Sequence, residues 1–245
     1  MKRPCSNNRS HLIPSLILLS LSLVSPGLAA QVPLRSFTAS YDLHKGSMHI
    51  AVSEISLQQT EQLWHWRATT AARGVYALFI KDKPYSETSF IQANDEIEIQ
   101  QILHADPGNP EKNVSVSFDW ASGSVEVLRK GRSKQLTLDE KVYDFQSIHL
   151  LAVSMRMQQL NEATVDFYRK GKITRSTLVY SGTGNVAING KSVAAEIFEQ
   201  KIVKSKTQYK YYYAAATPLL PLRVEKFKPG KTPVTLTLRK VDWDL

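Results

Sequence analysis

One short segment of the chain brings together the residue types of a hydrolytic triad. Asp144, Ser147 and His149 supply a carboxylate, a hydroxyl and an imidazole, the three groups that activate a serine nucleophile. They are neighbours in sequence, however, and no Gly-x-Ser-x-Gly turn accompanies them. Glu96 and Glu98 alternate along one predicted strand face, which is typical of a solvated sheet rather than of opposed glycosidase carboxylates. The sequence therefore predicts no catalytic residues.

A second segment resembles a phosphate-binding loop. Residues 184–192 end in Gly-Lys-Ser, but five residues separate the two glycines where the motif has four. The flanking residues also alternate between apolar and polar, as in strands, and no helix pattern follows. Asn189-Gly190 lies between the two alternating runs, and both residues tolerate positive φ. The segment is therefore predicted to be a tight β-hairpin.

Two strand-like segments carry aromatic side chains at alternate positions. Trp64 and Trp66 are predicted to share one sheet face, with His65 on the other. The segment 209–213 is predicted to place three tyrosines on one face and Lys210 with Tyr212 on the other. These aromatic residues could stack on a sugar or contact an apolar ligand. For the two tryptophans, packing in the core is the favoured interpretation, because large aromatic side chains dominate core burial. Aromatic residues interleaved with lysine also occur in nucleic-acid sites, but the charged and apolar start of the chain is typical of an exported protein, which disfavours a nucleic-acid partner.

Positive charge is concentrated towards the C-terminus. Between residues 200 and 240 the only acidic residue is Glu225, whereas lysine and arginine recur throughout. Such a bias attracts anionic partners over long distances, although lysines on exposed strands also protect sheet edges without binding anything. Lys226 and Lys228 are two positions apart and are predicted to share a solvated strand face. The candidate ligand-binding residues drawn from the aromatic and basic groups are Trp64, Trp66, Tyr211, Tyr213, Arg223, Lys226 and Lys228.

The sequence offers no recognisable set of metal ligands. Cys5 is the only cysteine, and the histidines have no metal-site spacing with other histidines or with acidic residues. Met155 and Met157 lie in an apolar segment and are interpreted as packing residues, because methionine fills irregular gaps in cores. We expect no metal, no cofactor and no disulfide in the mature chain.

The N-terminus has the layout of a secretory signal. Lys2, Arg3 and Arg9 precede an apolar run over 12–24, and small residues follow at 27–30. The run is shorter than the roughly 20 apolar residues that span a bilayer, which disfavours an uncleaved anchor. We predict a signal peptide over 1–30, cleaved after Ala29 or Ala30, and one periplasmic or secreted domain over 31–245 without a transmembrane segment. Cleavage lowers the basic total from 31 to 28 against 22 acidic residues, a formal charge of +6.

The mature chain has the pattern of many short strands interrupted by one helix. The alternation of apolar and polar residues changes phase at two places. It predicts a slip in the strand before Ile102 and a bulge near residues 53–54. Asp144 is predicted as the helix N-cap, and Arg156 is the only charged residue between 145 and 160, so the helix should be buried on most sides. The predicted fold is mainly β, a curved antiparallel sheet or barrel-like fold with one buried α-helix. The predicted strand segments are 37–41, 50–57, 63–67, 90–103, 114–119, 125–127, 136–138, 163–169, 174–180, 186–188, 191–193, 206–213, 222–227 and 232–243.

Several short motifs resemble those of a bacterial family of exported proteins, domain-of-unknown-function family 3108. The most specific is Leu-Pro-Leu-Arg-Val-Glu at 220–225, and others are Phe-Tyr-Arg-Lys-Gly-Lys at 167–172 and Phe-Thr-Ala-Ser-Tyr at 37–41. Together the motifs cover nearly the whole mature chain. The resemblance implies an exported, antiparallel and strongly curved or barrel-like sheet, and it carries over no catalytic residues.

These observations favour a non-catalytic protein of the cell envelope. The leading hypothesis is a binding or carrier module for an apolar or amphipathic envelope ligand, since a curved sheet can enclose one. One alternative is an envelope assembly or scaffolding partner that docks through its basic C-terminal strands. Another is a hydrolase of an envelope component. The expected partners are an envelope lipid, an anionic polymer or an envelope protein, and not nucleic acid.

Overall fold

Strands of one curved sheet make up most of the protein. The computed structural model describes residues 34–78, 82–93, 96–215, 217 and 219–244, so the predicted signal peptide lies outside the described residues. The strands of the first half are β1 Phe37–Lys45, β2 Met48–Thr60, β3 Leu63–Ala72, β4 Tyr85–Ala93, β5 Glu96–Ala105, β6 Val114–Asp119, β7 Ser124–Arg129 and β8 Arg132–Thr137. Those of the second half are β9 Val142–Tyr143, β10 Glu162–Arg169, β11 Lys172–Ile188, β12 Lys191–Ile202, β13 Gln208–Tyr213, β14 Pro221–Phe227 and β15 Val234–Trp243.

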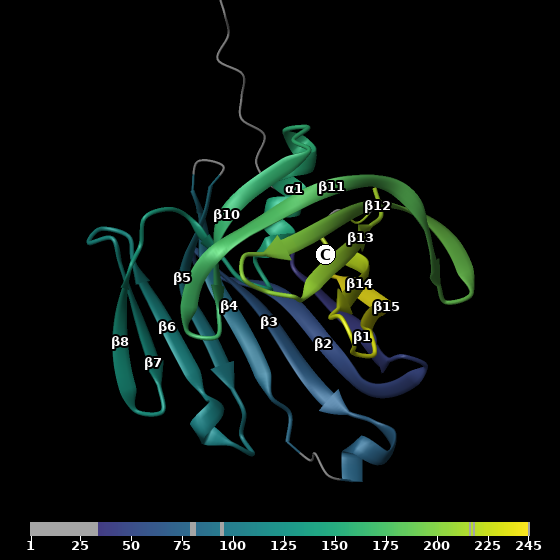
Figure 1. The fold of residues 1–245 in the computed structure, drawn as a ribbon, viewed down its shortest axis with the longest axis horizontal. Coiled ribbons are helices and arrows are strands. Elements are labelled where there is room, and N and C mark those ends of the chain that lie inside the picture. The colour runs from purple at the N-terminus through teal and green to yellow at the C-terminus, as the bar shows by residue number, and fades with distance from the viewer. Residues whose placement is uncertain (1–33, 79–81, 94–95, 216, 218, 245) are drawn as a thin grey trace, which may run out of the picture.

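The described strands form a single fifteen-stranded sheet in the order β8-β7-β6-β5-β4-β3-β2-β1-β15-β14-β13-β12-β11-β10-β9. Strands that follow one another along the chain pair antiparallel, except that β8 and β9 do not pair with each other and β9 pairs in parallel with β10. The last strand, β15, returns to pair with β1. The sheet has two edges, β8 and β9, and curves so that its halves wrap around one helix, as Figure 1 shows. The predicted curved, barrel-like β fold with one helix is confirmed.

The helix α1, Ile148–Met157, separates two clusters of core residues. Leu150 and Val153 pack with apolar residues mainly from the first half of the sheet. Ile148 and Met155 lie with Phe167 and other apolar residues of the second half. Positions 150 and 153 occupy a different helix face from 148 and 155. The helix is therefore buried on most sides, as its lack of charge predicted, and it joins the two halves of the sheet.

The helix begins slightly later than the N-cap prediction implied. Ser147 is the N-cap residue, and Asp144 lies in the turn before it. The Asp144 carboxylate still accepts the amide hydrogens of Gln146 and Ser147, at 3.2 and 2.9 Å. Its backbone oxygen accepts from the amide of Ile148 at 3.0 Å. Asp144 thus stabilises the turn that leads into α1, but it is not the cap itself.

Local irregularities were predicted with mixed success. Asn189 and Gly190 have φ of 49° and 76° and join β11 to β12, which confirms the tight hairpin. The slip before Ile102 is also confirmed, because the β4–β5 register shifts there. The bulge near 53–54 was wrong: the β1–β2 register shifts beside residue 50 instead. Ser53 keeps the phase of its strand as a buried polar residue whose hydroxyl lies 3.3 Å from that of Thr70.

Two short 3-10 helices lie in connections between strands. They are η1 Gly74–Leu78, between β3 and β4, and η2 Pro110–Lys112, between β5 and β6. Within the described part of the chain, no helix has both the length and the apolar character needed to cross a membrane.

Candidate functional site

Of the three groups that could have formed a hydrolytic triad, Asp144 and Ser147 share one hydrogen-bond network and His149 belongs to another. The Ser147 hydroxyl donates to Asp144 Oδ1 at 2.8 Å, which places it in the turn before the helix. His149 Nδ1 lies instead 2.7 Å from the hydroxyl of Tyr213, and its ring stacks on Trp66 with 5.4 Å between centroids. Burial lowers the pKa of His149 to about 3, so the imidazole is neutral at physiological pH. The structure therefore does not pair this serine with this histidine.

The aromatic candidates lie mostly in the core. Trp66, Tyr211 and Tyr213 are at most 2% exposed, and Trp64 is half-buried against the same core as Trp66. The Tyr211 hydroxyl donates to Gln200 Oε1 at 2.6 Å, which satisfies its polar end without a ligand. Packing is thus the role that their surroundings support for the three buried rings.

The basic candidates of the C-terminal strands are placed differently from one another. Arg223 Nε lies 2.8 Å from Glu225 Oε1, an ion pair within β14. Lys226 lines a cavity between the two halves of the sheet, whereas Lys228 lines a neighbouring depression. β14 ends at Phe227, so Lys226 and Lys228 do not continue along one strand face. Of the seven candidate residues, Lys226 is the one that lines the cavity.

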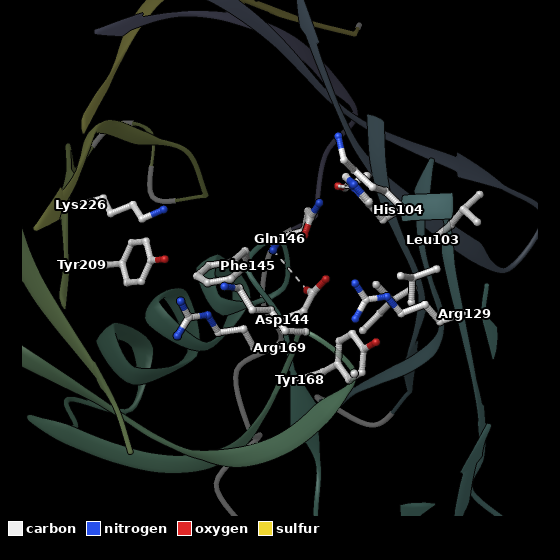
Figure 2. A pocket seen from close by; sticks show the side chains of 16 residues that line it. Leu103, His104, Arg129, Asp144, Phe145, Gln146, Tyr168, Arg169, Tyr209 and Lys226 are labelled. Carbon is white, nitrogen blue, oxygen red and sulfur yellow. Dashed lines mark hydrogen bonds between the residues drawn. The ribbon is translucent and has the colours of Figure 1, made fainter. Parts of the chain in front are cut away.

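This cavity has a volume of about 550 Å³ and lies where both halves of the sheet approach the turn before α1. Figure 2 shows Arg129 on one side, Tyr209 and Lys226 on the opposite side, and Arg169 between them. The lining residues from the first half are Ser86, Ile102, Leu103, His104, Lys112, Val114 and Arg129. The remaining lining residues are Asp144, Phe145, Gln146, Tyr168, Arg169, Lys170, Gly171, Tyr209 and Lys226.

The cavity gathers positive charge that the protein itself compensates little. Lys112 pairs with Asp106 at 3.1 Å, and Arg169 donates to the hydroxyl of Ser205 at 3.0 Å. Arg129, Lys170 and Lys226 form no ion pair with a carboxylate of the described residues. Such a cluster attracts anions.

The pKa of Lys226 responds to the positive charges around it. Partial burial lowers its pKa, and repulsion from Arg169, Lys170 and Lys228 lowers it further. Its ammonium nitrogen lies 6.0 Å from the centre of the Tyr209 ring, a cation–π contact at the outer limit of range. A bound anion would oppose the repulsion and raise this pKa towards its ordinary value.

Asp144, the acidic residue among the lining side chains, is already engaged. Thr88 donates to its Oδ2 at 2.5 Å, and Oδ1 accepts from the Ser147 hydroxyl and from two backbone amides. Burial raises the pKa of Asp144, while these hydrogen bonds act in the opposite sense. Its carboxylate is held by β4 and the turn, and it forms no ion pair with the arginines that line the cavity.

Part of the cavity wall is apolar. Phe145 packs edge-on against Phe167 and tilted against Tyr209, with 5.0 Å between centroids in each pair. Ile102 and Val114 line the side formed by the first half. The arrangement suits a molecule with one anionic end and one apolar end, because each would meet matching groups.

The two arginines were missed in the sequence, although a signal was present. Arg129-Lys130-Gly131-Arg132 and Arg169-Lys170-Gly171-Lys172 are near-identical tetrapeptides, one in each half of the chain. Both form tight turns in which the lysine and the glycine have positive φ. The recurrence of Arg-Lys-Gly followed by a basic residue marks two hairpins that the tertiary structure then brings to one cavity.

No metal site is evident. Among residues 34–78, 82–93, 96–215, 217 and 219–244, no group of three or more histidine, cysteine or acidic side chains is placed to hold a metal ion.

The fold and cavity define a class of protein: an open, barrel-like antiparallel sheet wrapped around one helix, with a cationic cavity between its halves. Residues 36–239 match the family described as Protein of unknown function (DUF3108), and the chain belongs to this family, as its motifs predicted. No curated protein matches the chain.

A solved structure shares the fold. A β-barrel-like protein of domain of unknown function DUF1849 from Brucella abortus is similar over 87% of this chain and 99% of its own, with a TM-score of 0.59 and 11% identity. A Bacteroides fragilis protein described as exported, with a YmcC-like fold, matches 86% of this chain and 98% of its own, with a TM-score of 0.32 and 8% identity. At 11% identity the first likeness shows the fold alone.

Proposed function

We propose that this protein is an exported, non-catalytic binding or carrier module of the cell envelope, and that its cavity binds an anionic amphiphile. The single observation that carries the proposal is the meeting of Arg129, Arg169, Lys170 and Lys226 in one cavity that also has an apolar wall. Charges of one sign repel each other, and an anion bound among them would remove that repulsion and accept charge-assisted hydrogen bonds.

The size and lining of the cavity support a small ligand. A volume of about 550 Å³ falls within the range of small-molecule sites, roughly 300–1,000 Å³. A phosphate or carboxylate head group would meet the arginines, and the start of an acyl chain would contact Phe145, Ile102 and Val114. Export rests on the N-terminal charge, apolar run and small residues of 1–30.

Binding of two twelve-carbon probes below their micelle concentrations tests the site. Dodecyl phosphate carries a net negative head group, and dodecyl phosphocholine carries a zwitterionic head group on the same chain. We expect isothermal titration calorimetry to show tighter binding of dodecyl phosphate. Arg129→Gln combined with Lys226→Gln should weaken that binding at least tenfold, because charge-assisted hydrogen bonds are each worth about 1.5–3 kcal/mol.

Lys191→Gln combined with Arg239→Gln is the matched control. It removes the same two charge types from exposed positions outside the cavity, and it should change affinity less than twofold. Equal loss in both double variants would mean that net charge, and not the cavity, governs binding. Unchanged affinity in the cavity variant would remove Arg129 and Lys226 from the site and overturn the proposal.

A further inference from the structure

The hairpin turns at one end of the strands are rich in lysine. Because successive strands are antiparallel, the connections at 46–47, 106–113, 130–131, 170–171, 203–207 and 228–233 all lie at the same end, and together they contain seven lysines. The connections at 61–62, 120–123, 138–141 and 189–190 lie at the other end and contain one basic residue, Lys141. Lys130, Lys170 and Lys204 have φ between 53° and 58°, a conformation that glycine or asparagine adopts at lower cost.

Six basic residues of this end surround a depression of about 680 Å³ that no acidic residue lines. We call them the basic rim: Arg169, Lys170, Lys172, Lys204, Lys206 and Lys228. Arg169 and Lys170 also line the cavity, so the rim adjoins it directly. The lysines of the rim form no ion pair with a carboxylate in the described part of the chain.

Exposed apolar side chains occur at the same end of the strands. Val203 is 50% exposed in the connection between β12 and β13, and Phe227 is 37% exposed where β14 ends. Val75 and Leu78 of η1, which follows β3, are more exposed still. Lysines interspersed with exposed apolar residues are typical of surfaces that lie on anionic bilayers, where the charges meet head groups and the apolar groups enter the interface.

We propose that the basic rim docks onto the surface of an anionic phospholipid bilayer and so brings the cavity to the lipid. The purpose of docking, delivery of a lipid to the adjoining cavity, rests on the proposed function. The docking itself can be tested separately. A bilayer is favoured over a soluble anionic polymer because Val203 and Phe227 are exposed beside the lysines. A polymer would use the charges and leave these apolar groups in water.

Vesicle flotation tests the proposal. We expect the protein to bind vesicles of phosphatidylcholine with a quarter phosphatidylglycerol, and not vesicles of phosphatidylcholine alone. Lys172→Gln, Lys204→Gln and Lys206→Gln combined should weaken binding by roughly 100-fold or slightly more at low salt, because each lysine near an anionic surface contributes roughly a factor of five. A control triple, Lys191→Gln, Arg239→Gln and Lys240→Gln, should bind nearly as wild type. Equal loss in both triples, or equal binding to neutral vesicles, would overturn the proposal.

A second pair of variants separates the bilayer from a polymer. Val203→Ser with Phe227→Ser keeps every charge and should weaken vesicle binding while leaving binding to dextran sulfate unchanged. No effect on vesicles would overturn docking through these apolar groups and favour a polymer. Circular dichroism melting of each variant confirms that the fold is intact.

Failure of docking and failure of the cavity are distinguishable. The three substituted lysines of the rim do not line the cavity, so that variant should still bind dodecyl phosphate. Vesicle binding by a protein that binds no dodecyl phosphate would leave the docking in place and remove the proposed function.

Discussion

Two polar regions adjoin α1, one around His149 and one in the cationic cavity, and they differ in how their polar groups are paired. In the first, His149 bonds to Tyr213 at 2.7 Å, and Gln200 links the hydroxyls of Tyr211 and Ser176 at 2.6 and 2.9 Å. These groups are buried and carry no net charge at neutral pH. In the cavity, Arg129, Lys170 and Lys226 are charged and have no carboxylate partner among the described residues.

The contrast separates polar groups that stabilise the fold from the candidate binding groups of the cavity. A buried polar group must find a partner within the protein, because an unpaired one costs about 1–3 kcal/mol. Charges at an open cavity can keep water as their partner until a ligand replaces it. The histidine and tyrosines that attract notice in the sequence therefore belong to the core, and the less conspicuous arginines of two hairpins form the candidate site.

The largest expected effect is on the packing around His149. Trp66 is 1% exposed and contacts both Phe37 and His149, with 5.5 and 5.4 Å between ring centroids. Trp66→Ala should lower the free energy of unfolding by about 3–5 kcal/mol, as large aromatic deletions in cores do. Urea unfolding measures this loss. Trp64→Ala, which removes a less buried tryptophan from the same strand, is the comparison and should cost less. A loss below about 1 kcal/mol would show that this region is not a rigid core.

A smaller effect is expected from pH. The pKa of His149 is lowered to about 3 by burial, against 6.5 in the unfolded chain, so the unfolded state binds more protons below neutrality. The contribution of His149 to the free energy of unfolding is therefore present above pH 6.5 and is lost as the pH drops towards 3. Between pH 7 and pH 5 we expect a loss of about 2 kcal/mol.

Comparison with His149→Gln isolates this contribution. Glutamine does not titrate, so the variant should lack the loss between pH 7 and pH 5, whatever its absolute stability. Asp144, whose pKa is raised by burial, acts in the opposite sense, but it is present in both proteins. The same pH dependence in the variant would assign it to other groups.

The smallest effect on stability is expected at the cavity. Arg129→Gln with Lys226→Gln removes charges that repel their neighbours, so the free energy of unfolding should stay within about 0.5 kcal/mol of wild type. Thermal and urea unfolding at low salt measure it, alongside Lys191→Gln with Arg239→Gln. Destabilisation by more than about 2 kcal/mol would mean that these residues hold the fold together, and the contrast between the two regions would fail.

Much of the fold follows from local patterns. Alternation along the chain predicts most strands, because the side-chain period of a strand does not depend on its neighbours. Asn189-Gly190 predicts its hairpin through backbone preference alone. The misplaced bulge near 53–54 shows the limit. Ser53 is inward and polar, which interrupts the apolar alternation, but β2 pairs with β1 and β3 in an unbroken register through this position.

The sequence by itself determined most of the strands, the buried helix, the family and the basic C-terminal bias. It did not separate β4 from β5, which the pattern joined as one segment over 90–103, and it did not reveal the short strand β9. Only the tertiary structure decided which of the basic residues meet. Arg129 and Arg169 lie forty positions apart, and nothing in either hairpin specifies that the other will face it. The sheet brings them together because it curves around α1, and that curvature depends on packing of the whole core. Burial likewise decided that Trp66, Tyr211 and Tyr213 are core residues, since alternation places a side chain on a face without saying what covers that face.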